Sequence, residues 1–152
     1  MTQLVGFIRT EFCYKKDMDI VSKIKRSEMM SNIKGKNTLP ELIVRKYLYS
    51  NGYRYRIHNT KLPGKPDIVL SRKKIAIEVR GCFWHGHRCR LASIPKTNRS
   101  FWIKKINENK LRDKNNSKKI RKIGYNLIVI HECRVRKGNY KKLLIKQIKK
   151  YA

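Results

Sequence analysis

Residues 81–89 read Gly-Cys-Phe-Trp-His-Gly-His-Arg-Cys, so two cysteines and two histidines lie close together in the sequence. Zinc prefers four sulfur or nitrogen ligands in a tetrahedron, and this dense set of thiols and imidazoles predicts a zinc site. A loop that offers three ligands needs a fourth from elsewhere, and Cys133, just after an expected strand, is the natural candidate. The alternative is a group of buried thiols beside a solvent-exposed histidine. The zinc interpretation requires a fold in which this loop meets the end of a distant strand.

The composition describes a very basic chain that can nevertheless fold. The chain has 152 residues, of which 40% are hydrophobic. That is enough to bury a core without disulfide bonds, and too many for a purely disordered basic tail. The formal net charge of +29 opposes compaction by self-repulsion, which a polyanionic partner relieves. Nucleic acid is the first expected partner, and an anionic membrane surface is the second.

The N-terminal residues carry no secretory signal, and no apolar run is long enough to span a bilayer. We therefore expect a cytoplasmic protein, in which cysteines serve as metal ligands or inert thiols. Residues 1–17 look like an appendage, because Met18 offers a second start directly before a more regular pattern. A start codon assigned too early is preferred to a functional arm, and Cys13 is then a bystander. Residues 18–152 are predicted to form a single domain.

Hydrophobic periodicity predicts helices and strands that alternate along the chain. The expected helices cover residues 22–33, 39–50, 99–123 and 140–151, and the expected strands cover residues 53–57, 67–70, 75–79 and 125–131. Thr38 and Glu41 fit a capping box at the start of the second helix, with Pro40 tolerated in its first turn. The second and third strands read as a hairpin, and residues 80–98 as an irregular loop. The predicted fold class is α/β, with a small mixed sheet flanked by helices.

The expected hairpin carries two acidic residues. Pro66 favours extended structure before it, and Asp67 then opens a strand where its carboxylate is a good ligand for a hard cation. Alternation places Glu78 and Arg80 on one face of the next strand, with Val79 on the other. Asp67 and Glu78 are then close enough to share a metal, in the arrangement of the PD-(D/E)XK nucleases with arginine where lysine is usual. The alternative is that Asp67 caps the turn and Glu78 pairs with a surface lysine.

Two large aromatic residues, Phe83 and Trp84, stand side by side in the loop. If one of them faces the core, the other faces away from it. They are expected either to pack as one buried and one half-buried residue, or to form a wedge that stacks on DNA bases. Trp102, early in the long helix, is a candidate third member of the wedge.

The long helix carries polar residues on its inner stripe. Asn109 and Asp113 are one turn apart and lie on the same side as Trp102 and Ile106. Polar groups on an inward face need partners, and a carboxylate there is well placed to orient a histidine such as His85.

Four parts of the sequence together resemble one known family. They are LPGKPDIV at residues 62–69, GCFWHGHRC at 81–89, Phe-Trp at 101–102 and His-Glu-Cys at 131–133. With a similarity that extends over about residues 20–136, the chain resembles the very-short-patch repair DNA endonucleases. The resemblance implies a PD-(D/E)XK restriction-endonuclease-like fold with one structural zinc. It also implies an enzyme that nicks the T-containing strand, 5′ of a T:G mismatch left by deamination of 5-methylcytosine.

The resemblance implies a role for individual residues. Asp67 matches a catalytic, magnesium-binding aspartate, His85 a histidine that serves as general base, and Asp113 the carboxylate partner of that histidine. Glu41 matches a helix glutamate of the active site. The zinc ligands match Cys82, His87, Cys89 and Cys133. The DNA-contacting positions match Met30 on the minor-groove side, Phe83, Trp84 and Trp102 on the major-groove side, and Lys105 and Asn109 at the mismatch or the site.

The chain departs from the family pattern just before the zinc loop. Arg80 stands where the family usually has histidine, and Val79 offers magnesium only its backbone carbonyl. Glu78 stands where the family commonly has an apolar residue. One hypothesis is that Glu78 and Arg80 restore a more ordinary PD-(D/E)XK centre, with Glu78 on the metal and Arg80 on the phosphate. The alternative is that Glu78 is structural and the enzyme works with fewer helpers.

The resemblance implies magnesium as catalytic and zinc as structural cofactor, because zinc with four protein ligands has no open position for chemistry. The implied substrate is double-stranded DNA with a T:G mismatch, nicked by a monomer near the nucleoid. The implied functional partner is a cytosine-5 DNA methyltransferase. Two other functions stay open: a restriction-type nuclease that cuts matched DNA, and a non-catalytic, zinc-stabilised nucleic-acid-binding protein.

Overall fold

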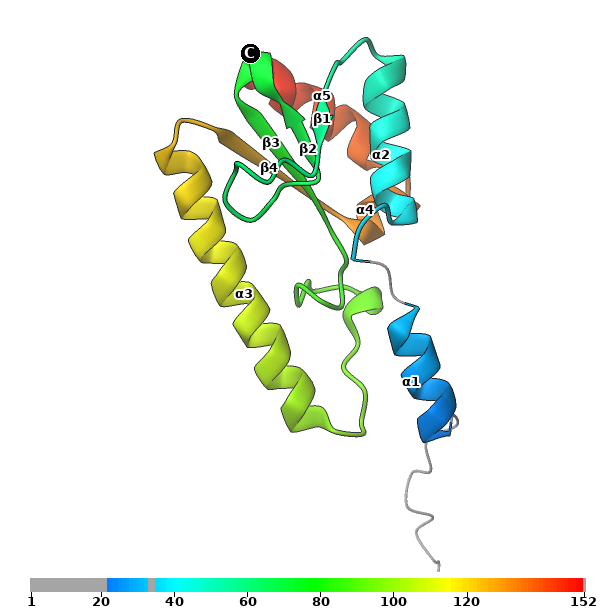
Figure 1. The fold of residues 1–152 in the computed structure, drawn as a ribbon. Coiled ribbons are helices and arrows are strands. Elements are labelled where there is room, and N and C mark those ends of the chain that lie inside the picture. Colours follow the sequence, from blue (N-terminus) through cyan, green and yellow to red (C-terminus); the bar gives the residue numbers. More distant parts are fainter. Residues whose placement is uncertain (1–21, 33–34, 152) are drawn as a thin grey trace, which may run out of the picture. The chain divides into compact units, whose positions relative to one another are not determined.

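The computed structural model of the protein describes residues 22–32 and 35–151 (Figure 1). The chain divides into a unit that ends at Ile33 and a second unit from Lys34 onward. In the first unit, helix α1 (Lys23–Ser31) confirms the helix expected at residues 22–33, with slightly shorter ends. The predicted boundary at residue 17 lies outside the described residues.

The second unit contains a four-stranded sheet in the order β1-β2-β3-β4. Its strands are β1 (Arg56–Ile57), β2 (Ile68–Leu70), β3 (Ile75–Arg80) and β4 (Asn126–His131). The first three strands are antiparallel neighbours, whereas β3 and β4 are parallel. The sheet is therefore mixed and the hairpin of β2 and β3 is present, both as predicted.

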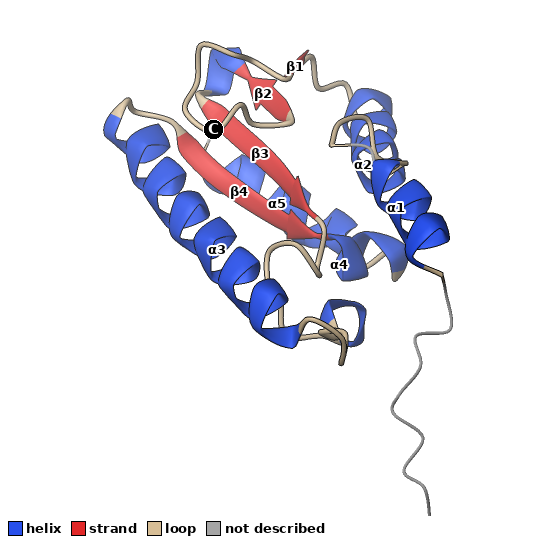
Figure 2. Cartoon of the chain, turned by 60° about the horizontal axis from the view of Figure 1, so that its bottom comes forward, coloured by secondary structure: helices blue, strands red, loops and turns tan. Residues whose placement is uncertain are grey.

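Helices cover the sheet on both of its faces. They are α2 (Leu39–Ser50), α3 (Arg99–Lys122), α4 (Glu132–Arg136) and α5 (Tyr140–Lys150), with short 3-10 turns η1 (Ser71–Lys73) and η2 (Arg90–Ala92). Figure 2 shows α5 behind the sheet and α3 along its β4 side. The main core joins α2, α4 and α5 to the sheet through Val44, Leu48, Ile68, Leu70, Ile75, Ile77, Val79, Ile128, Ile130, Val135, Tyr140, Leu144 and Ile148.

The alternation along β3 decides which side chains are left for a site. Ile75, Ile77 and Val79 belong to the main core. Successive residues of a strand point to opposite faces, so Glu78 and Arg80 lie together on the other face. This shared face is confirmed, because two nitrogens of Arg80 donate to Glu78 Oε2 at 2.8 and 2.6 Å.

Strand β1 is shorter than the predicted strand at residues 53–57. In the β1–β2 register Arg56 lies opposite Val69, so residues 53–54 would have to pair beyond the end of β2 at Leu70. The chain there turns into η1, and no ladder forms. Tyr55 instead donates its hydroxyl hydrogen to the backbone carbonyl of Arg45 at 3.2 Å.

The capping box predicted at the start of α2 is wrong, because neither of its two hydrogen bonds is present among the described residues. The Thr38 side chain forms no bond to a helix amide, and its hydroxyl donates to Glu41 Oε1 at 2.9 Å. Glu41 is 3% exposed, and a buried carboxylate needs donors. The Asn37 backbone N–H supplies another, at 3.0 Å from Glu41 Oε2. The hydroxyl is therefore used to hold the carboxylate.

Helix α4 was not expected from the sequence. It begins directly after β4 and ends before Gly138, whose φ of +71° suits glycine. Among the described residues, no helix is both long and apolar enough to cross a membrane.

Candidate functional site

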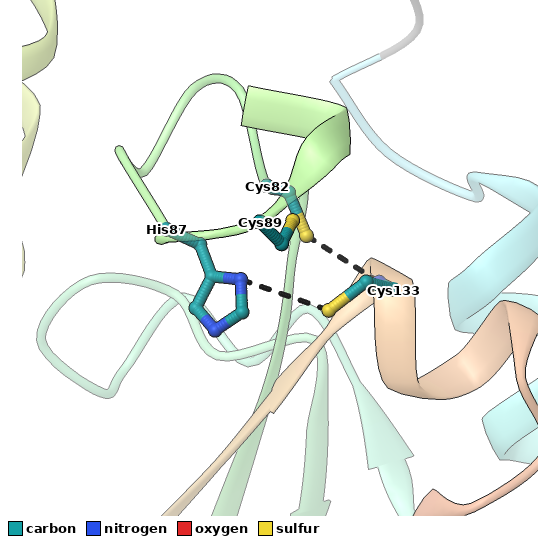
Figure 3. Close-up of side chains that lie close together, drawn as sticks. All are labelled: Cys82, His87, Cys89 and Cys133. Carbon is teal, nitrogen blue, oxygen red and sulfur yellow. Dashed lines mark hydrogen bonds between the residues drawn. The ribbon is translucent and has the colours of Figure 1, made fainter. Parts of the chain in front are cut away.

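Three sulfur atoms and one imidazole converge beside the ends of β3 and β4 (Figure 3). They belong to Cys82, His87, Cys89 and Cys133, and their ligand atoms all lie within 4.8 Å of one another. The Cys133 backbone N–H donates to Cys82 Sγ at 3.3 Å, and Cys133 Sγ lies 3.6 Å from His87 Nδ1. The loop and the distant strand therefore meet as the sequence predicts.

This donor set has the chemistry of a zinc site. Burial raises the pKa of Cys82 to about 12, whereas the hydrogen bond with His87 lowers the pKa of Cys89 to about 7. A metal ion deprotonates the thiols that coordinate it. Three thiolates and one imidazole form a closed tetrahedral set, which is typical of structural zinc. The residues present fit zinc by number, type and convergence.

Residues 81–89, called the zinc-cluster loop below, are held against α3 by a hydrogen bond to their backbone. Asn109, 6% exposed, donates Nδ2–H to the Trp84 carbonyl at 2.9 Å and accepts from Arg112 at 3.0 Å. Gly86 has a φ of +56°, and a Cβ there would lie 2.6 Å from Ile106 Cγ2. Asn109 thus holds the loop in this structure, and its expected contact with DNA stays a prediction.

Three aromatic rings of the loop and of α3 form one cluster. The Phe83 ring lies 5.1 Å from that of Trp84 and 5.2 Å from that of Trp102, and the two indoles are 5.9 Å apart. All three side chains are half-buried, and Phe101 extends the cluster with 57% of its surface exposed. The expected association of Trp102 with the pair is confirmed. The rings present apolar surface that water still reaches.

Asp67 stands at the start of β2, next to Glu78 across the ladder. Its Oδ2 accepts the backbone N–H of Val79 at 2.7 Å. Burial, and to a lesser extent the neighbouring Glu41 and Glu78 carboxylates, raise the pKa of Asp67 to about 6. A partly buried carboxylate beside two others is stabilised by a cation. Asp67 therefore fits a metal-binding carboxylate by its surroundings.

A chain of charged contacts runs from β3 to the zinc-cluster loop. Arg80 holds Glu78 Oε2, and its Nη1 lies 3.5 Å from Asp113 Oδ2. The same oxygen of Asp113 lies 2.6 Å from His85 Nδ1. An ionised carboxylate only accepts hydrogen bonds, so Nδ1 carries the proton and Nε2 of a neutral His85 keeps a lone pair. The contact of His85 with Asp113 is present as expected, and their roles stay predictions.

A second cluster joins Asp67 to helix α2. Ligand atoms of Glu41, His58 and Asp67 lie within 4.8 Å of one another. Arg45, 7% exposed, donates to Glu41 Oε2 and lies against His58 Nε2, both at 2.9 Å. Burial, and then the charge of Arg45, lower the pKa of His58. Sequence reasoning missed Arg45 and His58; the only signal was the helical i,i+4 spacing of Glu41 and Arg45.

The remaining predicted DNA contacts are placed as follows. Met30 belongs to α1, but its side chain lies outside the described residues. Lys105 is exposed on α3. Neither residue is shown to touch the clusters above, and both contacts stay predictions.

Comparison with known proteins gives one consistent result. Residues 18–91 match the model of the family described as DNA mismatch endonuclease Vsr. The chain is 46% identical over 118 residues to the type II nicking enzyme V.NmeAIP of Neisseria meningitidis, covering 78% of this chain and 84% of that relative. It is 33% identical over 118 residues to the DNA mismatch endonuclease Vsr of Escherichia coli, covering 78% of this chain and 76% of that relative.

A further relative is the type II nicking enzyme V.XorIIP of Xanthomonas oryzae, 40% identical over 115 residues, with 76% of this chain and 85% of that relative covered. The family match at residues 18–91 includes the strand of Asp67 and the zinc-cluster loop. The chain therefore belongs to the Vsr family and is a DNA endonuclease of the Vsr type.

Proposed function

We propose that the protein nicks the T-containing strand 5′ of a T:G mismatch, by magnesium-dependent hydrolysis in very-short-patch repair. The observation that carries the proposal is the set of contacts linking the strand of Asp67, through Glu78 and Arg80, to the His85–Asp113 pair. A metal-binding carboxylate and an oriented imidazole are the two groups that phosphodiester hydrolysis needs. The three-ring cluster supports recognition of a distorted duplex.

Magnesium fits at Asp67. The residues that would hold it are Asp67, the backbone carbonyl of Val79 and Glu78. The carboxylates of Asp67 and Glu78 are hard oxygen ligands, and their mutual repulsion favours a cation between them. When bound, magnesium polarises the scissile phosphate and stabilises its developing charge. Glu41 lies beside Asp67 and is proposed to belong to the same active site.

Glu78 and Arg80 have two competing roles. As catalytic groups, Glu78 shares the metal and Arg80 binds the phosphate; as structural groups, they only neutralise one another. The two hydrogen bonds that Arg80 donates to Glu78 Oε2 suit both roles. Nicking by Glu78→Gln decides between them, because a lost metal ligand abolishes nicking, whereas a lost ion pair leaves most of it.

His85 is proposed to take the proton from the attacking water, with Asp113 fixing its ring. We expect His85→Gln to lower kcat by about 10²- to 10⁴-fold, the usual share of general acid–base catalysis. Asp113→Asn should lower kcat less than His85→Gln does. The kcat of the double variant should be no lower than that of His85→Gln, because the two groups act as one unit. Single-turnover nicking measures all three. Independent, multiplying losses would contradict this pairing.

The three-ring cluster of Phe83, Trp84 and Trp102 is proposed to enter the DNA stack. We expect Trp84→Ala to weaken binding to a T:G duplex by about 5- to 150-fold, the value of one stacked base. Binding is measured by fluorescence anisotropy with matched T:A and T:G duplexes. Phe101→Ala, at the exposed edge of the cluster, is the matched control and should lose less affinity for the T:G duplex. Equal losses on both variants would contradict a specific wedge.

The test of the proposed function is strand nicking of end-labelled duplexes with Mg²⁺. Duplexes with a T:G or a matched T:A pair are compared in several flanking sequences. Nicking at T:G alone, leaving a 3′ hydroxyl and a 5′ phosphate, supports the mismatch endonuclease. Equal cutting of matched DNA favours a restriction-type enzyme, and tight binding without cutting favours a non-catalytic binding protein.

The biological setting follows from the same proposal. The enzyme acts as a monomer on double-stranded DNA in the cytoplasm, near the nucleoid, with zinc as its structural ion. A cytosine-5 DNA methyltransferase is the proposed functional partner, because deamination of its product creates the T:G substrate.

A further inference from the structure

A buried cage surrounds one oxygen of Glu41. Arg45 donates Nη2–H to Glu41 Oε2 at 2.9 Å and Nη1–H to Asn37 Oδ1 at 2.7 Å. His58 Nε2 lies 2.9 Å from the same Nη2 of Arg45. The Glu41 and Arg45 side chains are 4% and 9% exposed, and the His58 side chain is 17% exposed. The guanidinium is therefore held at three points, away from bulk water.

The chemistry of arginine fixes the role of His58. A guanidinium has donors and no acceptor, so Nε2 of His58 accepts and the ring is neutral, with its proton on Nδ1. The Nε2 of such a ring cannot also donate to Asn37 Oδ1, 3.3 Å away, so the Arg45 contact is its one hydrogen bond among the described residues. His58 thus orients the guanidinium from the segment that follows β1.

The backbone supports this arrangement at some cost. Asn37 and His58 have φ values of +55° and +45°, a region that residues other than glycine seldom occupy. Both side chains touch Arg45 from these positions. Uncommon backbone conformations persist where the surroundings require them, and they concentrate at functional sites.

The cage also explains which charges are left beside Asp67. Ligand atoms of Glu41, His58 and Asp67 lie within 4.8 Å of one another, an arrangement that by itself would suggest a shared metal. Arg45 already neutralises Glu41 and occupies the His58 lone pair. Asp67 is then the carboxylate of this group that keeps an uncompensated charge.

We propose that Arg45 and His58 are positioning residues of the nuclease, which hold Glu41 against Asp67 without binding metal or DNA. The inference rests on the proposed nicking activity. Arg45 sets the orientation and charge of Glu41, and His58 holds Arg45 as a hydrogen-bond acceptor. A side chain with another hydrogen-bond acceptor should therefore preserve the function of His58, whereas an apolar side chain should not.

The test compares His58→Gln with His58→Leu. Glutamine offers a side-chain oxygen to Arg45, and leucine has a similar size but no acceptor. We expect His58→Leu to lower kcat on a T:G duplex about 10- to 100-fold, the value of a hydrogen bond to a charged group. His58→Gln should stay near wild type, and KM should change little in either variant. Thr60→Ala, exposed in the same loop, is the control, and zinc content and circular dichroism monitor folding.

Two results would overturn the inference. Equal, large losses in both variants would mean that the imidazole itself is required, as a metal ligand or a base. Wild-type kcat in both variants would mean that the cage is dispensable. Arg45→Gln is avoided as the main variant, because it leaves Glu41 as an unpaired buried charge and endangers folding.

A second measurement does not depend on activity. Imidazole ¹⁵N NMR, assigned with His58→Gln, should show the Nδ1-protonated tautomer of His58 in the wild type. A proton on Nε2 would overturn the cage. A wild-type protein that nicks no duplex would refute the proposed function, while the tautomer would still test the contact with Arg45.

Discussion

Replacing Asp67 by asparagine is expected to abolish nicking of a T:G duplex. Magnesium supplies several kcal/mol of transition-state stabilisation, and a loss of about 4 kcal/mol lowers the rate about 10³-fold. Asparagine keeps an oxygen that accepts the Val79 N–H, so local geometry is preserved and only the charge is lost. Single-turnover nicking at saturating enzyme measures the effect, with duplex binding monitored in parallel.

The same substitution should stabilise the protein in the absence of magnesium. Because burial raises the pKa of Asp67 from 3.8 to about 6, the folded state keeps a proton that the unfolded state has released. Ionising Asp67 therefore costs stability as the pH rises through the range between these values, by about 3 kcal/mol at pH 7. In urea unfolding at pH 7, the free energy of unfolding of Asp67→Asn should be higher than that of the wild type. This difference in stability should disappear below pH 4. An inactive but destabilised variant would contradict this account of Asp67.

Removing one zinc ligand is expected to unfold the region around the zinc-cluster loop. Structural zinc sites contribute folding free energy outright, about 10–16 kcal/mol in zinc-finger peptides, whereas a whole domain is stable by about 5–15 kcal/mol. We expect Cys133→Ala to lose its zinc, to lower the urea midpoint strongly and to lose nicking. Metal analysis and circular dichroism measure the first two effects.

Cys13 provides the matched control for this experiment. It lies outside the described residues and is predicted to be a bystander, so Cys13→Ala should keep one zinc per chain and wild-type stability. Cys133→Ala protein that retains a full equivalent of zinc would refute the four-ligand site. Retained stability after complete loss of zinc would refute its structural role.

Features that depend on local sequence could be predicted. The helix at residues 39–50 is confirmed, and the β2–β3 hairpin follows from two apolar runs around a polar turn. Strand β1 could not be delimited, because its length depends on where β2 ends. Helix α4 is five residues long, which is too short for a hydrophobic period to be detected.

The same distinction holds for the candidate site: residues marked by a local sequence pattern could be predicted, and the others could not. The Cys/His cluster could be predicted because three of its members crowd one loop, and the pairing of His85 with Asp113 could be predicted because the inner stripe of α3 needs partners. The cage of Arg45 and His58 was missed. These residues are 13 positions apart and meet only once the segment after β1 lies against Arg45 of α2, so no local pattern marks them.

The parallel pairing of β3 with β4 has a consequence for how the chain folds. Parallel strands form contacts between distant residues, which slows folding because the intervening chain must first close into a loop. Here Arg80 pairs with His131, and Cys82 and Cys133 follow these strand ends 51 residues apart. An ion captured by both cysteines would close that loop early, leaving the strands to align in register. The rate at which newly made chains mature would then depend on the supply of free zinc.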